Sequence, residues 1–530
     1  MAEKRLFVRT ASGLVRIIGP FAAMVFGVHC ISLSSSGLIP YAWIPWLWPG
    51  SDLIAVLTIS MLLCLLHATT YSQIGSIYPR SGGDYVLGSR VINPTLQFGA
   101  SFMFIIFTSL TAGALIAWIP SSVLPSFFWS WGVIFNSPQS LAWADWIVTP
   151  IGVLTVGLIF VVVTYICMIM PTRTVVRILN LGFFLGMLAW VLMWISYAMC
   201  PSHEAFVAAW NRFSPVTYEK VIPLAQENGL TYGVTPWWLM TMAGMIMGFW
   251  VYYGYYIPNF FAGELKEAPK TLIIGTWSSL LVTWGVFTLG AALMYPRLMS
   301  LEWMAAEGYL YYNVKAVWAL PFSTYYANIL WPNPIPVFII MFGFVYTLVN
   351  LAMTYFFYNS RILFAMAFDR ALPEAIAYVH PKLRSPVTAM TLCAVFAAIG
   401  VGLSVYTVIF VQYNFVLYCT LVQLIPVTGA ILFPFLRKDQ FERAPSLVKF
   451  RVGPIPGITL IGIGTLGYLL WMIISTYLFP AVGGLISWLT VGWFIGFFVT
   501  GIIIFRLMRW YRLRKEGLDI NLAYKEIPPL

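Results

Sequence analysis

Two apolar stretches of the sequence contain residue types that interrupt a membrane helix. The first reads GVHCISLSSSGLIP (27–40), and the second reads GFWVYYGYYIPN (248–259). Backbone groups freed at membrane depth are tolerated only where they are buried in protein or line a polar cavity. A half-helix N-terminus attracts an anionic group, and freed C-terminal carbonyls attract a cation. Matched interruptions in two halves of a chain therefore predict a central binding site, whereas close helix packing is the alternative for either stretch alone.

Matched interruptions of this kind are typical of membrane transporters, many of which move an ion together with the substrate. Four side chains could bind such a coupling ion. His29 lies beside the first interruption and could carry a proton, with His67 behind it, although either histidine also fits a neutral packing role. Hydroxyls of Thr347 and Thr354, together with carbonyls of the first stretch, could supply oxygen ligands to sodium. Alternatively, each hydroxyl bonds the backbone of its own helix. The coupling ion, H⁺ or Na⁺, therefore stays open, and no other cofactor is expected.

The six cysteines indicate neither a disulfide framework nor a metal centre. They lie mostly inside apolar runs, form no CxxC pair, and have no histidine at metal-ligand spacing. Enzymatic activity is not expected, because no nucleophile, metal cluster or carboxylate pair stands near a membrane segment.

The composition is that of a multi-span membrane protein, with 60% apolar and only 9% charged residues among 530, against about a quarter charged in soluble domains. Stretches without Asp, Glu, Lys or Arg mark the spans, since a charge at mid-bilayer costs about 2.5–3.5 kcal/mol. Eight single spans are predicted near 17–40, 53–77, 95–119, 146–170, 178–199, 237–262, 271–295 and 335–360. The stretches 385–436 and 452–505 each hold two more, broken near 406–414 and 480–484. An all-α protein of twelve transmembrane helices follows, with 120–144, rich in Pro, Ser and Trp, as an interfacial loop.

The basic residues predict the orientation of the chain in the membrane. With both ends cytoplasmic, 25 of the 29 Lys and Arg residues lie inside, and four lie in the two outer segments. The cytoplasmic parts are then 1–16, 437–455 and 506–530 together with short loops, and the outer segments are 200–236 and 296–334. Because the net charge of +11 is scattered between apolar runs, a nucleic-acid partner is not expected. The predicted location is the cell membrane, with the lipid bilayer as partner.

The spans themselves contain no Asp, Glu, Lys or Arg. No side chain can therefore neutralise a fixed substrate charge at the bilayer centre, which disfavours substrates with a net charge. A zwitterion held by backbone dipoles fits better, and the aromatic residues of 248–256 suit a fairly large apolar side chain.

Three motifs resemble those of the amino acid–polyamine–organocation (APC) superfamily of secondary transporters. They are YPRSGGDYV (78–86), AGELKEAPK (262–270), and SRILFAMAFDRALP (360–373) followed by Ser385-Pro386. The resemblance implies two inverted five-helix repeats, 17–199 and 237–436, with broken first and sixth helices. Two peripheral helices in 456–505 complete the implied fold.

The resemblance also implies roles for individual residues. In such relatives the substrate carboxylate meets backbone N–H groups of the broken first helix, and the ammonium meets freed carbonyls. Here the matching run is Ser34–Gly37, or a register shifted toward Ser32. Gly254 and Gly263, nine residues apart, place Trp250 at the position of a gating aromatic residue that stacks over the substrate. The expected substrate-binding residues are Ser34, Ser35, Ser36, Gly37, Gly248, Trp250, Tyr253 and Gly254. Glu264 is expected in an inner gating network with Asp84, Arg361 and Asp369, unless these charges merely cap helices or pair as solvated residues.

The predicted function is secondary transport of amino acids, as neutral zwitterions, by alternating access. Alternatives are a cation–chloride or other organic-solute carrier of the same fold, and a transport-dead sensor or channel-like protein. The sequence specifies neither the side chain of the substrate nor a partner subunit.

Overall fold

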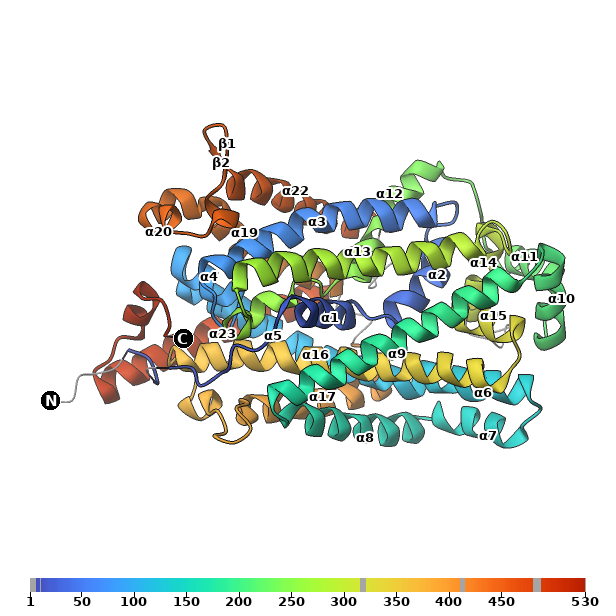
Figure 1. The fold of residues 1–530 in the computed structure, drawn as a ribbon, viewed down its shortest axis with the longest axis horizontal. Coiled ribbons are helices and arrows are strands. Elements are labelled where there is room, and N and C mark those ends of the chain that lie inside the picture. The colour runs from blue at the N-terminus through green and yellow to red at the C-terminus, as the bar shows by residue number, and fades with distance from the viewer. Residues whose placement is uncertain (1–5, 10, 315–320, 410–414, 480–487, 530) are drawn as a thin grey trace.

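The protein is a bundle of long helices that run side by side (Figure 1). The computed structural model describes residues 6–9, 11–314, 321–409, 415–479 and 488–529. The segment before the first helix and the segment after the last one lie at the same end, called the inner end below. Four short helices, α10, α11, α14 and α15, cover the opposite, outer end (Figure 1).

The helices of the first half are α1 (Pro20–Ile31), α2 (Ser35–Leu47), α3 (Leu53–Ile77), α4 (Asp84–Val91), α5 (Pro94–Trp118), η1 (Ile119–Val123), α6 (Leu124–Ile134), α7 (Pro138–Ile147), α8 (Pro150–Ile169), α9 (Thr172–Met199), α10 (His203–Phe213) and α11 (Tyr218–Glu227). Those of the second half are α12 (Trp237–Tyr252), η2 (Ile257–Phe260), η3 (Ala262–Glu264), α13 (Ala268–Met294), α14 (Leu301–Tyr309), η4 (Leu310–Val314), α15 (Ser323–Leu330), α16 (Pro334–Phe368), η5 (Glu374–Ala377), α17 (Val387–Tyr406) and α19 (Phe415–Leu436). The last part holds α20 (Lys438–Glu442), α21 (Ser446–Lys449), the hairpin of β1 (Arg451–Val452) and β2 (Ile455–Pro456), α22 (Gly457–Leu478), α23 (Trp488–Glu516) and η6 (Ile520–Lys525).

The helices confirm an all-α, multi-span membrane protein. Ten helices of the described chain are long and apolar enough to cross a membrane, and α1 with α2, bent by 41°, makes an eleventh span. The sixth predicted span holds only sixteen α-helical residues, α12, before the chain leaves the α-helix. The count of twelve and the inverted repeat therefore stay predictions.

The prediction of a loop over 120–144 is wrong. Helix α5 continues through the π-helical turn η1 into α6, and α7 returns beside α6 as a helical hairpin at the outer end (Figure 1). Pro120 lies in η1, and Pro125 follows directly at the start of α6, inside one continuous helix. A proline removes one i→i−4 hydrogen bond of a helix, and the π-helical turn replaces that hydrogen-bond pattern locally. Since the hairpin turns back on itself, α8 keeps its predicted direction.

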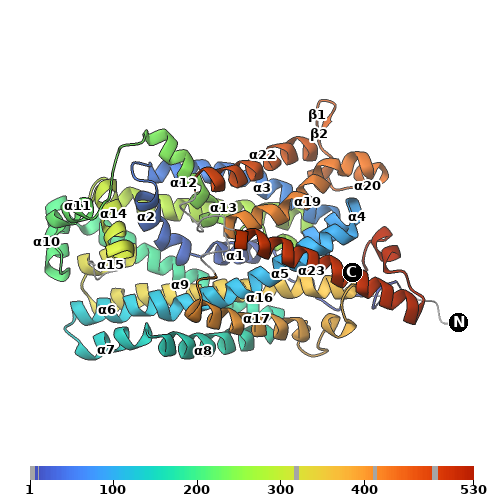
Figure 2. The same cartoon turned by 180° about the vertical axis from the view of Figure 1, so that it is seen from behind.

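The last two long helices pack on the outside of the bundle (Figure 2). Helix α22 contacts α19 and α3, and α23 contacts α5. The predicted breaks near 406–414 and 480–484 follow the ends of α17 and α22, although 410–414 and 480–487 lie outside the described residues. The outer segments predicted at 200–236 and 296–334 contain the short helices of the outer end.

Candidate functional site

The first membrane span is broken between α1 and α2. Ser32, with φ 76°, ends α1 in the left-handed region, and its hydroxyl accepts a hydrogen bond from the N–H of Ser35 (3.0 Å). Hydroxyls in a serine run compete for backbone groups in this way and so favour a break. The break spans 32–34, so that Ser35, Ser36 and Gly37 form the first turn of α2. The N–H groups of this turn have no intrahelical partners and face the break.

The sixth span is broken after α12. Gly254 has φ +119°, and a Cβ built there would lie 2.6 Å from the carbonyl carbon of Cys30. Position 254 therefore requires glycine for two reasons: the backbone conformation has a positive φ, and the first span approaches too closely for a Cβ atom. The chain then continues in the short 3-10 turns η2 and η3. Both predicted interruptions are confirmed, and they touch each other.

A cavity of about 250 Å³ lies between the two breaks. Its walls come from α1, α2, α5, α12, α16 and α19, which are far apart in the sequence. Aromatic side chains dominate the lining: Trp43, Trp118, Trp250, Tyr253, Tyr355 and Phe415. None of the described residues that line it is charged.

Four of the predicted binding residues line this cavity, namely Ser35, Ser36, Trp250 and Tyr253. The Trp250 ring lies against Trp43, with centroids 6.4 Å apart and planes inclined by 24°. The other four, Ser34, Gly37, Gly248 and Gly254, are absent from its lining.

Two of the predicted glycines, Gly37 and Gly248, lie close against neighbouring helices. A Cβ at Gly37 would lie 2.4 Å from the ring of Trp190, and a Cβ at Gly248 would lie 1.9 Å from the hydroxyl of Ser60. These positions need glycine because another helix comes within contact of the backbone. The alternative of small-residue packing thus applies to these glycines.

The other eleven lining residues were not predicted as binding residues, and they include Trp43, Thr111, Trp118, Tyr355 and Phe415. Trp43 lies seven residues after Ser36, on the same face of α2, and Thr111 and Trp118 are likewise seven apart on α5. Helical spacing could group such residues on one face. It could not tell which face meets the cavity.

The predicted ion-coupling residues point to other partners. The Nε2 of His29 lies 2.7 Å from the carbonyl oxygen of Leu179 in α9. Thr347 and Thr354 donate to carbonyl oxygens of their own helix, at 3.1 and 2.7 Å. None of the three belongs to the cavity lining.

His67 holds the broken segment of the sixth span. Its Nδ1 accepts from the hydroxyl of Tyr255 (2.8 Å), and its Nε2 donates to the amide oxygen of Gln423 (2.9 Å). The amide nitrogen of Gln423 donates to the hydroxyl of Tyr256 (2.8 Å). This assignment satisfies both ring nitrogens of a neutral histidine. Side chains of α3 and α19 thereby fix Tyr255 and Tyr256, which lie between α12 and η2.

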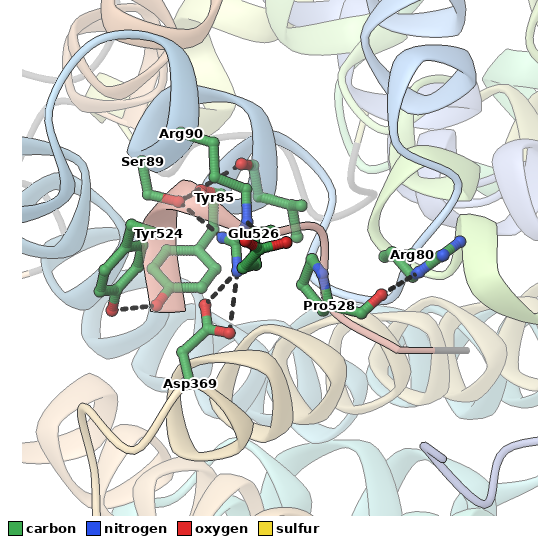
Figure 3. A network of polar contacts seen from close by, with 9 residues as sticks. Arg80, Tyr85, Ser89, Arg90, Asp369, Tyr524, Glu526 and Pro528 are labelled. Carbon is green, nitrogen blue, oxygen red and sulfur yellow. Dashed lines mark hydrogen bonds and ion pairs between the residues drawn. The ribbon is translucent and has the colours of Figure 1, made fainter. Parts of the chain in front are cut away.

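Buried ion pairs close the inner end. Arg361 binds Glu264 through two hydrogen bonds of 2.8 and 3.2 Å, and its guanidinium lies 3.5 Å from the centroid of the Phe357 ring. Arg90 binds both oxygens of Asp369 at 2.9 and 3.0 Å (Figure 3). The first pair joins the exit of the sixth span to α16, and the second joins α4 to the end of α16.

Asp84, the fourth member of the expected network, makes a different contact. Its carboxylate accepts from the hydroxyl of Tyr71 (3.3 Å). Burial raises the pKa of Asp84 to about 7.

The comparison with protein families gives one match, to a family described as amino acid permease, over residues 21–505. The chain belongs to this amino acid permease family. The matched region includes both breaks, the whole cavity and the inner ion pairs. The permease is therefore a membrane transporter of amino acids or organic solutes, and its family is one of transporters and not of enzymes. Among curated proteins, none matches the chain.

Proposed function

We propose that this permease is a secondary active transporter that carries neutral, zwitterionic amino acids across the cell membrane by alternating access. The observation that carries the proposal is the cavity where the two helix breaks meet. Such a cavity offers backbone donors and acceptors together, and its described lining contains no charged side chain. A zwitterion matches this arrangement because its two charges can be met by opposite helix ends.

The start of α2 suits the carboxylate of the substrate. Ser35 and Ser36 line the cavity in its first turn, where N–H groups without intrahelical partners point toward the break. Carbonyl groups freed at the ends of α1 and α12 suit the ammonium group. The aromatic walls leave an apolar space for a large, uncharged side chain.

Alternating access would require the inner end to open. The Glu264–Arg361 and Arg90–Asp369 pairs join segments that would have to separate, which supports a gating role for them. We take the inner end to be cytoplasmic, on the distribution of Lys and Arg. Coupling to H⁺ or Na⁺ stays a prediction, since His29, Thr347 and Thr354 are absent from the cavity lining.

Uptake into proteoliposomes tests the proposal. Neutral amino acids should compete for uptake, and unlabelled substrate inside should accelerate entry of labelled substrate, as a carrier requires. Decarboxylated analogues should compete poorly, because they lack the group that meets α2. Preference for a polyamine would contradict the zwitterion proposal, and flux without acceleration by internal substrate would indicate a channel.

A further inference from the structure

The segment after α23 folds back over the inner end of the permease (Figure 1). Gly517, with φ +63°, allows the turn, and the N–H of Leu518 donates to the carbonyl oxygen of Arg512 (3.2 Å). Two hydrogen bonds of 2.9 Å from Arg509 to Asp519 fix the direction of the returning chain. Residues 517–529, called the tail below, thus take a defined course.

Tyr524 anchors the middle of the tail. Its hydroxyl lies 2.8 Å from the hydroxyl of Tyr85, and its ring lies 5.3 Å from the guanidinium carbon of Arg90 (Figure 3). Arg90 also donates from Nε to the carbonyl oxygen of Glu526 (3.0 Å). The guanidinium that binds Asp369 across the inner end therefore also binds the tail.

The last described residues of the tail fill a gap between separate helices. Pro528 accepts a hydrogen bond from Nε of Arg80 (2.5 Å). Pro528 and Pro529 share a small cavity with Ser81, Gly263 and Ala365. These three residues come from the segment after α3, the exit of the sixth span, and α16. The tail thus binds the segment after α3 directly and lines one cavity with residues of the other two inner motifs.

We propose that the tail is a strap that stabilises the inner-closed state and must leave before the inner end opens. The proposal rests on the transport by alternating access proposed above. Opening must separate Arg90 from Asp369 at the end of α16, and the tail binds both Arg90 and Arg80 on one side of this junction. Movement there would also reshape the small cavity that Pro528 and Pro529 line together with Ala365. Contacts that exist only in the closed state shift the equilibrium toward that state. The strap therefore sets how often the cavity opens inward.

Labelling of Cys30 can measure this opening, because Cys30 lines the central cavity. The background lacks the other five cysteines, and a charged, membrane-impermeant thiol reagent is applied from the side of the inner end. Deletion of residues 526–530 removes the bonds from Arg80 and Arg90, and Arg80→Gln removes one of them from an intact chain. A hydrogen bond to a charged group corresponds to roughly tenfold in an equilibrium. We expect labelling to accelerate roughly tenfold with Arg80→Gln and further with the deletion. The matched control, Leu522→Ala, alters an exposed tail side chain and should leave the rate unchanged.

If both variants still insert in the membrane and the labelling rate of Cys30 is unchanged in each, the proposal that the tail restrains opening is overturned. Because this readout needs no substrate, it is separate from the proposed function. Absence of amino acid uptake by the unaltered permease would refute the proposed function, and the labelling rates would still decide whether the tail restrains opening.

Discussion

Removing one partner of the Glu264–Arg361 ion pair should destabilise the permease far more than removing both. Glu264→Gln keeps the shape of the carboxyl group but leaves a buried guanidinium without its counter-charge. Arg361→Met introduces an apolar chain whose sulfur can contact the ring of Phe357. The double variant carries neither charge.

The distances and burial of the pair set the expected size of this effect. At 2.8 Å and an effective dielectric constant of about 20, the attraction is about 6 kcal/mol. The two side chains are 1% and 0% exposed, so desolvation offsets most of this attraction. A single substitution removes the attraction and leaves one desolvated charge, which costs about 3–5 kcal/mol. The double variant should lose much less, so that the coupling free energy exceeds about 2 kcal/mol.

A double-mutant cycle on purified protein measures this coupling. Unfolding by SDS in mixed micelles, followed by tryptophan fluorescence, gives the free energy of unfolding for each of the four proteins. The exposed pair Lys270–Glu267, with a nitrogen–oxygen distance of 3.7 Å, is the control, and its coupling should stay below about 1 kcal/mol. If the losses in free energy of unfolding for Glu264→Gln and Arg361→Met add up to that of the double variant within about 0.5 kcal/mol, the predicted coupling within the buried pair is refuted.

Three further predictions concern the cavity, the pH dependence of stability and the orientation. Trp250→Ala should weaken substrate binding about tenfold and Trp250→Phe much less, in a scintillation proximity assay, because the aromatic contact is lost only in the first. Because the pKa of Asp84 is raised, the folded state binds a proton more tightly than the unfolded chain. The melting temperature should therefore fall as pH rises from about 5 to 7.5. Asp84→Asn should flatten this dependence on pH. Single cysteines should be labelled from outside intact cells at Lys220→Cys and not at Lys270→Cys; the reverse would contradict the orientation.

The sequence predicted the membrane class, most spans and both helix breaks, because these depend on local properties. A charge-free run of twenty residues favours the bilayer whatever its neighbours are, and Gly254 interrupts a helix through its own backbone freedom. The loop prediction for 120–144 failed because a local π-helical turn accommodates the prolines inside a continuous helix, and composition does not show where such a turn forms. The register of the break was left open between Ser34–Gly37 and a shift toward Ser32, because neighbouring serines compete for the backbone equally well, and the break lies at 32–34.

Only the tertiary structure decided which side chains meet. Trp43, Trp118 and Phe415 share one cavity although they lie on three different helices, and no periodicity along one helix specifies its partner. The pairing of Arg361 with Glu264, and of Asp369 with Arg90, likewise depends on how the helices pack. Local sequence determines where a chain crosses the membrane and where a helix must break, because lipid and the backbone act on each segment separately. Contacts between segments hundreds of residues apart depend on the packing of the whole bundle. The tertiary structure therefore decided the lining of the cavity and the partners in the inner ion pairs.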